Sequence, residues 1–177
     1  MLEVASGQIG VQESTGHNDG PVAAYMPAWA RGKGLPWCAW FVGWCWRQAF
    51  GEWLYGQHWG GGWDLFREAR EAGDLLSLGP WPELQAQPGD VFVILHTGDV
   101  MQRGPSHVGF IGRVSDDGER VNTIEGNLRN GVRVATRQMD EFTAVIHPYR
   151  SVEDFQAPYD RGLIPAPMAH RRPGDTR

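Results

Sequence analysis

The 177-residue sequence is long enough for one domain with its own core and too short for two full domains. Its formal net charge of −5 argues against nucleic-acid binding, which usually needs a basic face. No apolar run approaches the roughly 20 residues of a membrane span, and the first residues lack the pattern of a secretory signal. Neither nucleic acid nor membrane is therefore expected as a partner.

Helical patterns fill the first half of the chain. Apolar spacing predicts a helix over 2–12, a short helix over 22–29 and a strongly apolar helix over 37–50. A third amphipathic helix is predicted over 63–72. Because the helix over 37–50 is apolar on nearly all sides, we expect it to lie at the centre of the domain.

The second half of the chain changes to the two-residue period of strands. We predict strands over 91–95, 106–114, 120–124, 132–136 and 144–147. Helices followed by strands indicate an α+β domain, with the N-terminal helices packed against a C-terminal antiparallel sheet. We assign this domain to residues 1–150 and a tail rich in proline and arginine to residues 151–177.

Cys38 is the first candidate for chemistry. It stands at the predicted start of the central helix, where unpaired backbone N–H groups and the helix dipole favour the nucleophilic thiolate. Cys45 lies two turns deeper in the same helix, about 10 Å along its axis, so a disulfide between the two cysteines is not expected. We interpret Cys45 as a buried structural residue.

A nucleophilic cysteine needs a base, and His107 has the most suitable context among the six histidines. In the strand Ser106–Phe110, His107 and Gly109 share one face, and Gly109 leaves space beside the imidazole for a helix end or a substrate. The next hairpin supplies Glu125 and Asn127 as acceptors for the ring, provided that the strand continues through them; a turn at this point is the alternative.

These motifs, in this order, resemble the CHAP family (cysteine, histidine-dependent amidohydrolases/peptidases) of the papain-like superfamily. The resemblance covers about residues 3–150 and has its closest likeness in phage lysins. It rests on the segments Pro36–Val42, Pro88–Val91, Ser106–Phe110 and Ile124–Asn127, with Ile9–Glu13 and Asn18–Gly20 near the N-terminus.

The resemblance implies a papain-like fold and hydrolysis of an amide bond in peptidoglycan, either between sugar and stem peptide or within the peptide. Cys38 would be the nucleophile, His107 the general base and then acid, Glu125 the orienting acceptor and Asn127 a further polar group. Some phage relatives bind calcium, but Glu13 and Asp19 match that site weakly, so no metal or other cofactor is expected. The resemblance favours a phage endolysin or virion-associated lysin, made in the cytoplasm and acting on the wall after lysis, export or virion delivery.

Nine tryptophans are more than one core of this size needs, so some rings are expected to line a groove. We assign substrate contacts to Trp37, Trp59 and Trp63, of which the last two flank a glycine-rich loop. Packing of a small domain is the alternative explanation for these rings.

Other functions remain open from the sequence. They are a secreted antibacterial amidase effector, a peptidoglycan-binding module without catalysis, and a metal site built from His96, His107, His147 and Asp90 or Asp99. The histidine spacing does not match common zinc motifs, so we predict no metal. The protein is expected to be a monomer.

Overall fold

The computed structural model describes residues 1–57, 60–77, 86–97 and 101–148. Helices precede most of the strands, and their bounds are α1 Leu2–Ser6, η1 Gly20–Tyr25, α2 Cys38–Phe50, η2 Leu54–Gly56 and α3 Gly62–Ala72. The strands are β1 Leu75–Ser77, β2 Val91–Leu95, β3 Ser106–Val114, β4 Arg120–Leu128, β5 Gly131–Gln138 and β6 Ala144–Ile146, with η3 Met139–Glu141 between the last two. The expected α+β class is confirmed.

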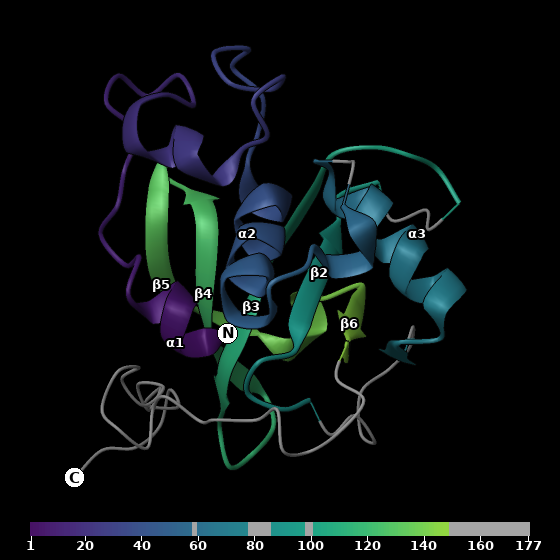
Figure 1. Cartoon of the computed structure of the whole chain (residues 1–177). Coiled ribbons are helices and arrows are strands. Elements are labelled where there is room, and N and C mark those ends of the chain that lie inside the picture. Colours follow the sequence, from purple (N-terminus) through teal and green to yellow (C-terminus); the bar gives the residue numbers. More distant parts are fainter. Residues whose placement is uncertain (58–59, 78–85, 98–100, 149–177) are drawn as a thin grey trace, which may run out of the picture.

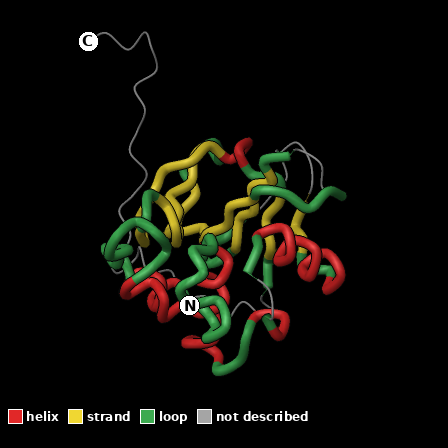
Figure 2. The backbone as a smooth tube through the Cα atoms, turned by 90° about the horizontal axis from the view of Figure 1, so that it is seen from above, coloured by secondary structure: helices red, strands yellow, loops and turns green. Residues whose placement is uncertain are grey.

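The six strands form one antiparallel sheet in the order β1-β6-β2-β3-β4-β5. Figure 1 shows α2 and α3 covering one face of this sheet, and Figure 2 shows that the sheet curves around its opposite face. The strand β1 was not predicted; it consists of only three residues and pairs with β6 at the edge of the sheet.

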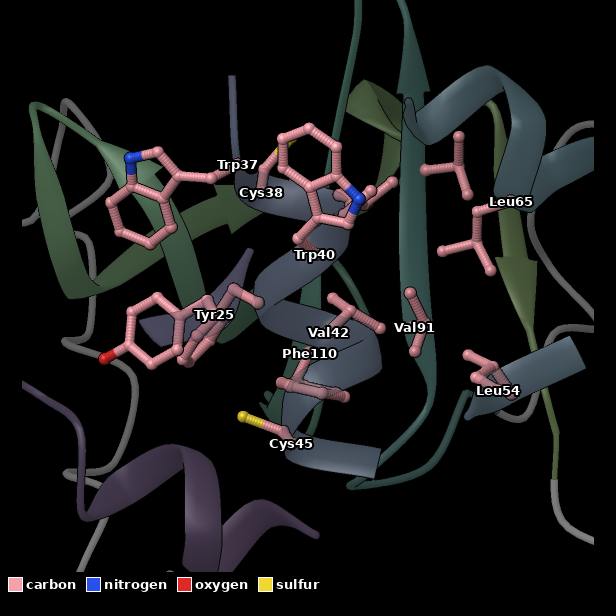
Figure 3. Close-up of a cluster of buried hydrophobic side chains, with 14 of the residues drawn as sticks. Tyr25, Trp37, Cys38, Trp40, Val42, Cys45, Leu54, Leu65, Val91 and Phe110 are labelled. Atoms are coloured by element: carbon pink, nitrogen blue, oxygen red, sulfur yellow. The ribbon is translucent and has the colours of Figure 1, made fainter. Parts of the chain in front are cut away.

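Two apolar clusters fill the two faces of the sheet. The larger lies between the helices and the sheet, and its members around α2 include Tyr25, Trp37, Cys45 and Phe110 (Figure 3). The smaller fills the curved inner face and contains Phe92, Ile111, Val121, Met139, Phe142 and Val145. Alternation along the strands therefore sends every second side chain away from the helices, into the curve of the sheet.

The two N-terminal helices differ most from the prediction. The helix expected over 2–12 ends after Ser6, and Gly10 has a φ of 94°, which an α-helix does not tolerate. The helix expected over 22–29 is a 3-10 helix, Gly20–Tyr25, that ends before Pro27. Within the described residues, no helix combines the length and apolar character needed to cross a membrane.

Candidate active site

Cys38 is the first residue of α2, as expected, with Trp37 as the N-cap. Its side chain is 4% exposed and lines a cavity of about 660 Å³. The first N–H groups of an α-helix have no partner within the helix, so backbone donors lie next to the thiol. Both cysteines are free, which confirms that Cys38 and Cys45 do not form a disulfide.

His107 lies on β3 and lines the same cavity as Cys38. Its Nε2 is 2.7 Å from Oε2 of Glu125, which leaves Nδ1 as the ring nitrogen for another partner. Burial lowers the pKa of His107, but hydrogen bonding to Cys38 and Glu125, together with their charges, raises it to about 9. The imidazole therefore interacts with both the thiol and the carboxylate.

Glu125 lies within β4, so the strand does continue through it and the alternative of a turn is excluded. The side chain is fully buried and accepts hydrogen bonds from Thr123, His107 and Arg137. Burial raises the pKa of Glu125, but the hydrogen bonds from Arg137, His107 and Thr123 bring it down to about 2. Glu125 is thus a carboxylate throughout the physiological pH range.

The space beside Gly109, which was expected to admit a helix end or a substrate, is filled by residues of the fold. A Cβ atom at Gly109 would lie 2.8 Å from Cε1 of Phe92 and 2.9 Å from Cγ of Glu125. Gly109 therefore makes room for the buried carboxylate and for Phe92, and not for a helix end or a substrate. The imidazole and the carboxylate lie on the inner face of the sheet. Phe110 points to the opposite face, where its ring packs on Phe41 of α2.

Asn127 also lines the cavity, but it does not continue the alternation of β4. The pairing of β4 with β5 is irregular between Glu125 and Leu128, and Asn127 has a φ of 60°. A local bulge of this kind re-aims a side chain at the end of a strand. The structure thus brings all four predicted polar residues, Cys38, His107, Glu125 and Asn127, to one region.

The predicted tryptophan contacts require correction. Trp37 is fully buried, and its Nε1 donates a hydrogen bond to Oε1 of Glu13, 2.9 Å away, so it cannot touch a substrate. Trp63 packs against the core and is not part of the cavity wall, whereas Trp59 lies outside the described residues. Among the described residues, the tryptophans that line the cavity are Trp29 and Trp40, whose rings meet edge to face at 5.8 Å.

Two charged residues of the cavity wall were not predicted from the sequence. Arg103 and Arg137 both line it, and Arg137 binds Glu125 through two nitrogens. The alternation of β5 could have revealed Arg137, because a hairpin around Asn130 puts it on the same face as Glu125. Arg103 and Trp29 lie in loops, for which periodicity gives no signal.

His96 lines the cavity, whereas Glu13, Asp19, Asp90 and His147 have partners within the fold. Oε2 of Glu13 accepts a hydrogen bond from the backbone of Asn18, and Asp19 binds Thr15. His147 pairs with the buried Asp90 at 2.7 Å. In the described parts of the chain, no group of three or more His, Cys, Asp or Glu side chains is arranged to hold a metal ion; Asp99 lies outside them.

Comparison with known proteins agrees with this geometry. The family model of the CHAP domain matches residues 30–127, more than half of the chain. The protein therefore belongs to the CHAP family, and the expected papain-like α+β fold is confirmed. Membership implies a hydrolase with amidase or peptidase activity on peptidoglycan. Searches of curated proteins and of solved structures gave no match.

Proposed function

We propose that this protein hydrolyses an amide bond of peptidoglycan by nucleophilic catalysis at Cys38. His107 serves as general base and acid, and Glu125 holds the imidazole. The observation that carries the proposal is the thiol and the imidazole at the wall of one cavity, with the buried carboxylate of Glu125 bound to the far nitrogen of the ring. A nucleophile, a base and an orienting acceptor in this order are the parts that acyl transfer requires.

The reaction proceeds in two halves. The Cys38 thiolate attacks the amide carbonyl, and backbone N–H groups at the start of α2 stabilise the resulting oxyanion. The imidazolium of His107 gives its proton to the leaving amine as the C–N bond breaks, which leaves a thioester. Water then attacks the thioester while His107 takes its proton, and the carboxylate product leaves as the thiolate and imidazolium are restored.

Asn127 is the fourth polar group at this cavity. We assign it a contact with the polar groups of the substrate next to the scissile bond. Its left-handed backbone conformation costs free energy of the order of 1–3 kcal/mol, and such residues concentrate at functional sites.

Two parts of the cavity wall differ in chemistry. This difference favours cleavage of the bond between sugar and stem peptide. Trp29 is 55% exposed and presents an aromatic surface, and its ring is supported edge to face by the buried Trp40. Arg103 lines the cavity as well; its guanidinium is bound to Asp64 at 2.9 Å but is 72% exposed, so its other N–H groups can donate to a peptide carboxylate. A substrate with a sugar ring at one end and an acidic peptide at the other complements both parts, which supports an N-acetylmuramoyl-L-alanine amidase over an endopeptidase.

Mass spectrometry of digested peptidoglycan tests the choice of bond. Cleavage by an amidase gives stem peptides with a free amino terminus at L-alanine and glycan strands that carry free lactyl carboxylates. New amino termini inside the stem or cross-bridge, with the sugar–peptide bond intact, would assign the enzyme to the endopeptidases instead.

The proposed catalysis is tested by Cys38→Ala on purified cell walls. We expect the loss of all measurable turbidity clearing, because no other residue of the cavity wall supplies a thiol among the described residues. Cys45→Ala is the matched control, since its thiol is fully buried away from the cavity, and it should clear walls at close to the wild-type rate. Full activity of Cys38→Ala would refute the mechanism and point to a different hydrolytic centre, whereas no clearing by the unaltered protein would favour a binding module.

We further propose that the protein acts as a phage lysin that reaches the wall after lysis, export or virion delivery. The support is the likeness of its N-terminal motifs to phage lysins. Expression inside a susceptible bacterium, with and without a membrane-permeabilising holin, tests this role. Lysis only with the holin is expected, whereas killing of neighbouring cells by a secreting strain would favour the antibacterial effector.

A further inference from the structure

The carboxylate of Glu125 is saturated with hydrogen-bond donors. Its Oε1 accepts from Oγ1 of Thr123 at 2.5 Å and from Nε of Arg137 at 2.6 Å. Its Oε2 lies 2.7 Å from Nε2 of His107 and accepts from Nη2 of Arg137 at 2.7 Å. The guanidinium of Arg137 therefore bridges both oxygens, and one of these oxygens is the acceptor for the imidazole.

Arg137 reaches this position from the neighbouring strand. In the register of β4 and β5, Arg133 lies opposite Glu125, whereas Arg137 lies opposite Val121. The Arg137 side chain thus runs along the inner face of the sheet, with its guanidinium over the ring of Phe92 at 5.5 Å. Its remaining terminal nitrogen, Nη1, donates to Oε2 of Glu141 at 3.0 Å. The bidentate contact with Glu125 and the ring of Phe92 hold the guanidinium within the fold, and Glu141 contacts it from the exposed side.

We propose that Arg137 is a positioning residue of the catalytic group, which sets the rotation of the Glu125 carboxylate and through it the orientation of His107 toward Cys38. This inference rests on the proposed function. A carboxylate that is free to rotate about its last torsion offers the imidazole a range of acceptor directions. A bidentate guanidinium reduces that range to one plane, because both of its N–H groups must meet the two oxygens.

The charge of Arg137 has a second effect at the same site. Glu125 is fully buried, and a buried carboxylate without a cation becomes neutral more readily. A neutral Glu125 no longer stabilises the imidazolium that forms during the reaction. The titratable and charged groups around Glu125 are His107 on β3, Arg133 and Arg137 on β5, Cys38 beyond His107 and Glu141 beyond Arg137.

The test compares two variants of Arg137 in the full chain. Arg137→Lys keeps the charge but replaces the planar fork with a single ammonium, and we expect kcat to fall about 10- to 100-fold with KM changed less than about threefold. Arg137→Ala should lose more, and the acid limb of its kcat/KM profile should move to higher pH because the pKa of Glu125 rises. A purely structural role would lower the amount of folded protein without moving the limb.

Glu141→Gln is the matched control. It removes the other carboxylate bound to Arg137 and leaves the bidentate contact with Glu125 in place. Because the Glu141 side chain is 41% exposed, we expect kcat and the pH profile to stay within about twofold of the wild type. A loss equal to that of Arg137→Lys would show that the outer ion pair, and not the fork on Glu125, sets the activity, and would overturn the inference.

Chemical rescue keeps the test decisive if the variants are less stable. Arg137 lines the cavity, so its removal leaves a space that small solutes can enter. Methylguanidinium at millimolar concentration should raise the kcat of Arg137→Ala at least about tenfold. Methylammonium should raise it less. No rescue, or wild-type kcat in Arg137→Lys, overturns the role of Arg137. Full activity of Cys38→Ala would instead overturn the proposed function, so the two failures are distinguishable.

Discussion

His107 keeps its proton in alkaline solution because two acidic partners act on one ring. Burial opposes the charge on the imidazole, yet Cys38 and Glu125 raise the pKa of His107 to about 9. The imidazolium is therefore present at neutral pH and can protonate a leaving amine. As the pH rises through about 9 this proton is lost, so kcat/KM should fall over that range.

Replacing Cys38 should lower the pKa of His107. In Cys38→Ala the hydrogen bond and the charge of the sulfur are both lost, while the burial that lowers the pKa remains. Titration of the His107 ring by ¹⁵N NMR checks this, with the unaltered protein as reference. A pKa still near 9 in the alanine variant would mean that the thiol does not act on the ring.

Elements of the fold turn these residues toward one another. The start of α2 brings Cys38 to one end of the sheet, whereas β3 and β4 present His107 and Glu125 from the inner face. The strand positions were predictable, because a period of two and the turn residues between 114 and 120 are local signals. The prediction of β3 as 106–114 is confirmed residue for residue.

Other parts of the site could not be predicted from local patterns in the sequence. Which face of the sheet is the inner one depends on its curvature, and curvature depends on the packing of all six strands (Figure 2). The buried indole N–H of Trp37 finds its acceptor in Glu13, 24 residues earlier. The bulge at Asn127 depends on the register between two strands. Such long-range contacts leave no periodic trace in the sequence.

Gly109→Ala should damage both stability and activity. The added Cβ would lie 2.9 Å from the backbone oxygen of Ile124 and 2.8 Å from Phe92, neither of which can move freely within the sheet. Overpacking of this kind costs roughly 1–3 kcal/mol of the free energy of unfolding, and displacement of Glu125 should reduce kcat as well. Urea unfolding and wall clearing measure the two effects.

Gly7→Ala is the control for this change. Its added Cβ meets only backbone oxygens at 3.5 and 3.6 Å, and its φ of −66° suits alanine. We expect stability and activity close to those of the wild type. If both glycine variants behaved alike, the close approach at Gly109 would not matter for the site.

At the scale of the whole molecule, described residues up to 148 form a six-stranded sheet with an apolar cluster on each face. The boundary near residue 150 is a prediction from the sequence. We expect a chain that ends at Arg150 to keep its melting temperature within a few degrees and to clear purified walls. Calorimetry and turbidity measurements check this. A fall of more than about 8 °C, roughly 2–4 kcal/mol for a domain of this size, would show that the tail belongs to the folded unit.

The contrast between the two cysteines allows the working molecules in a sample to be counted. Burial raises the pKa of the Cys45 thiol well above its ordinary value, and its side chain has no exposed surface. Cys38 faces the cavity. A small alkylating reagent should therefore label one sulfur per native chain and two after denaturation, and the labelled fraction of the native sample gives the concentration of intact sites. Rates can then be stated per competent molecule and not per milligram.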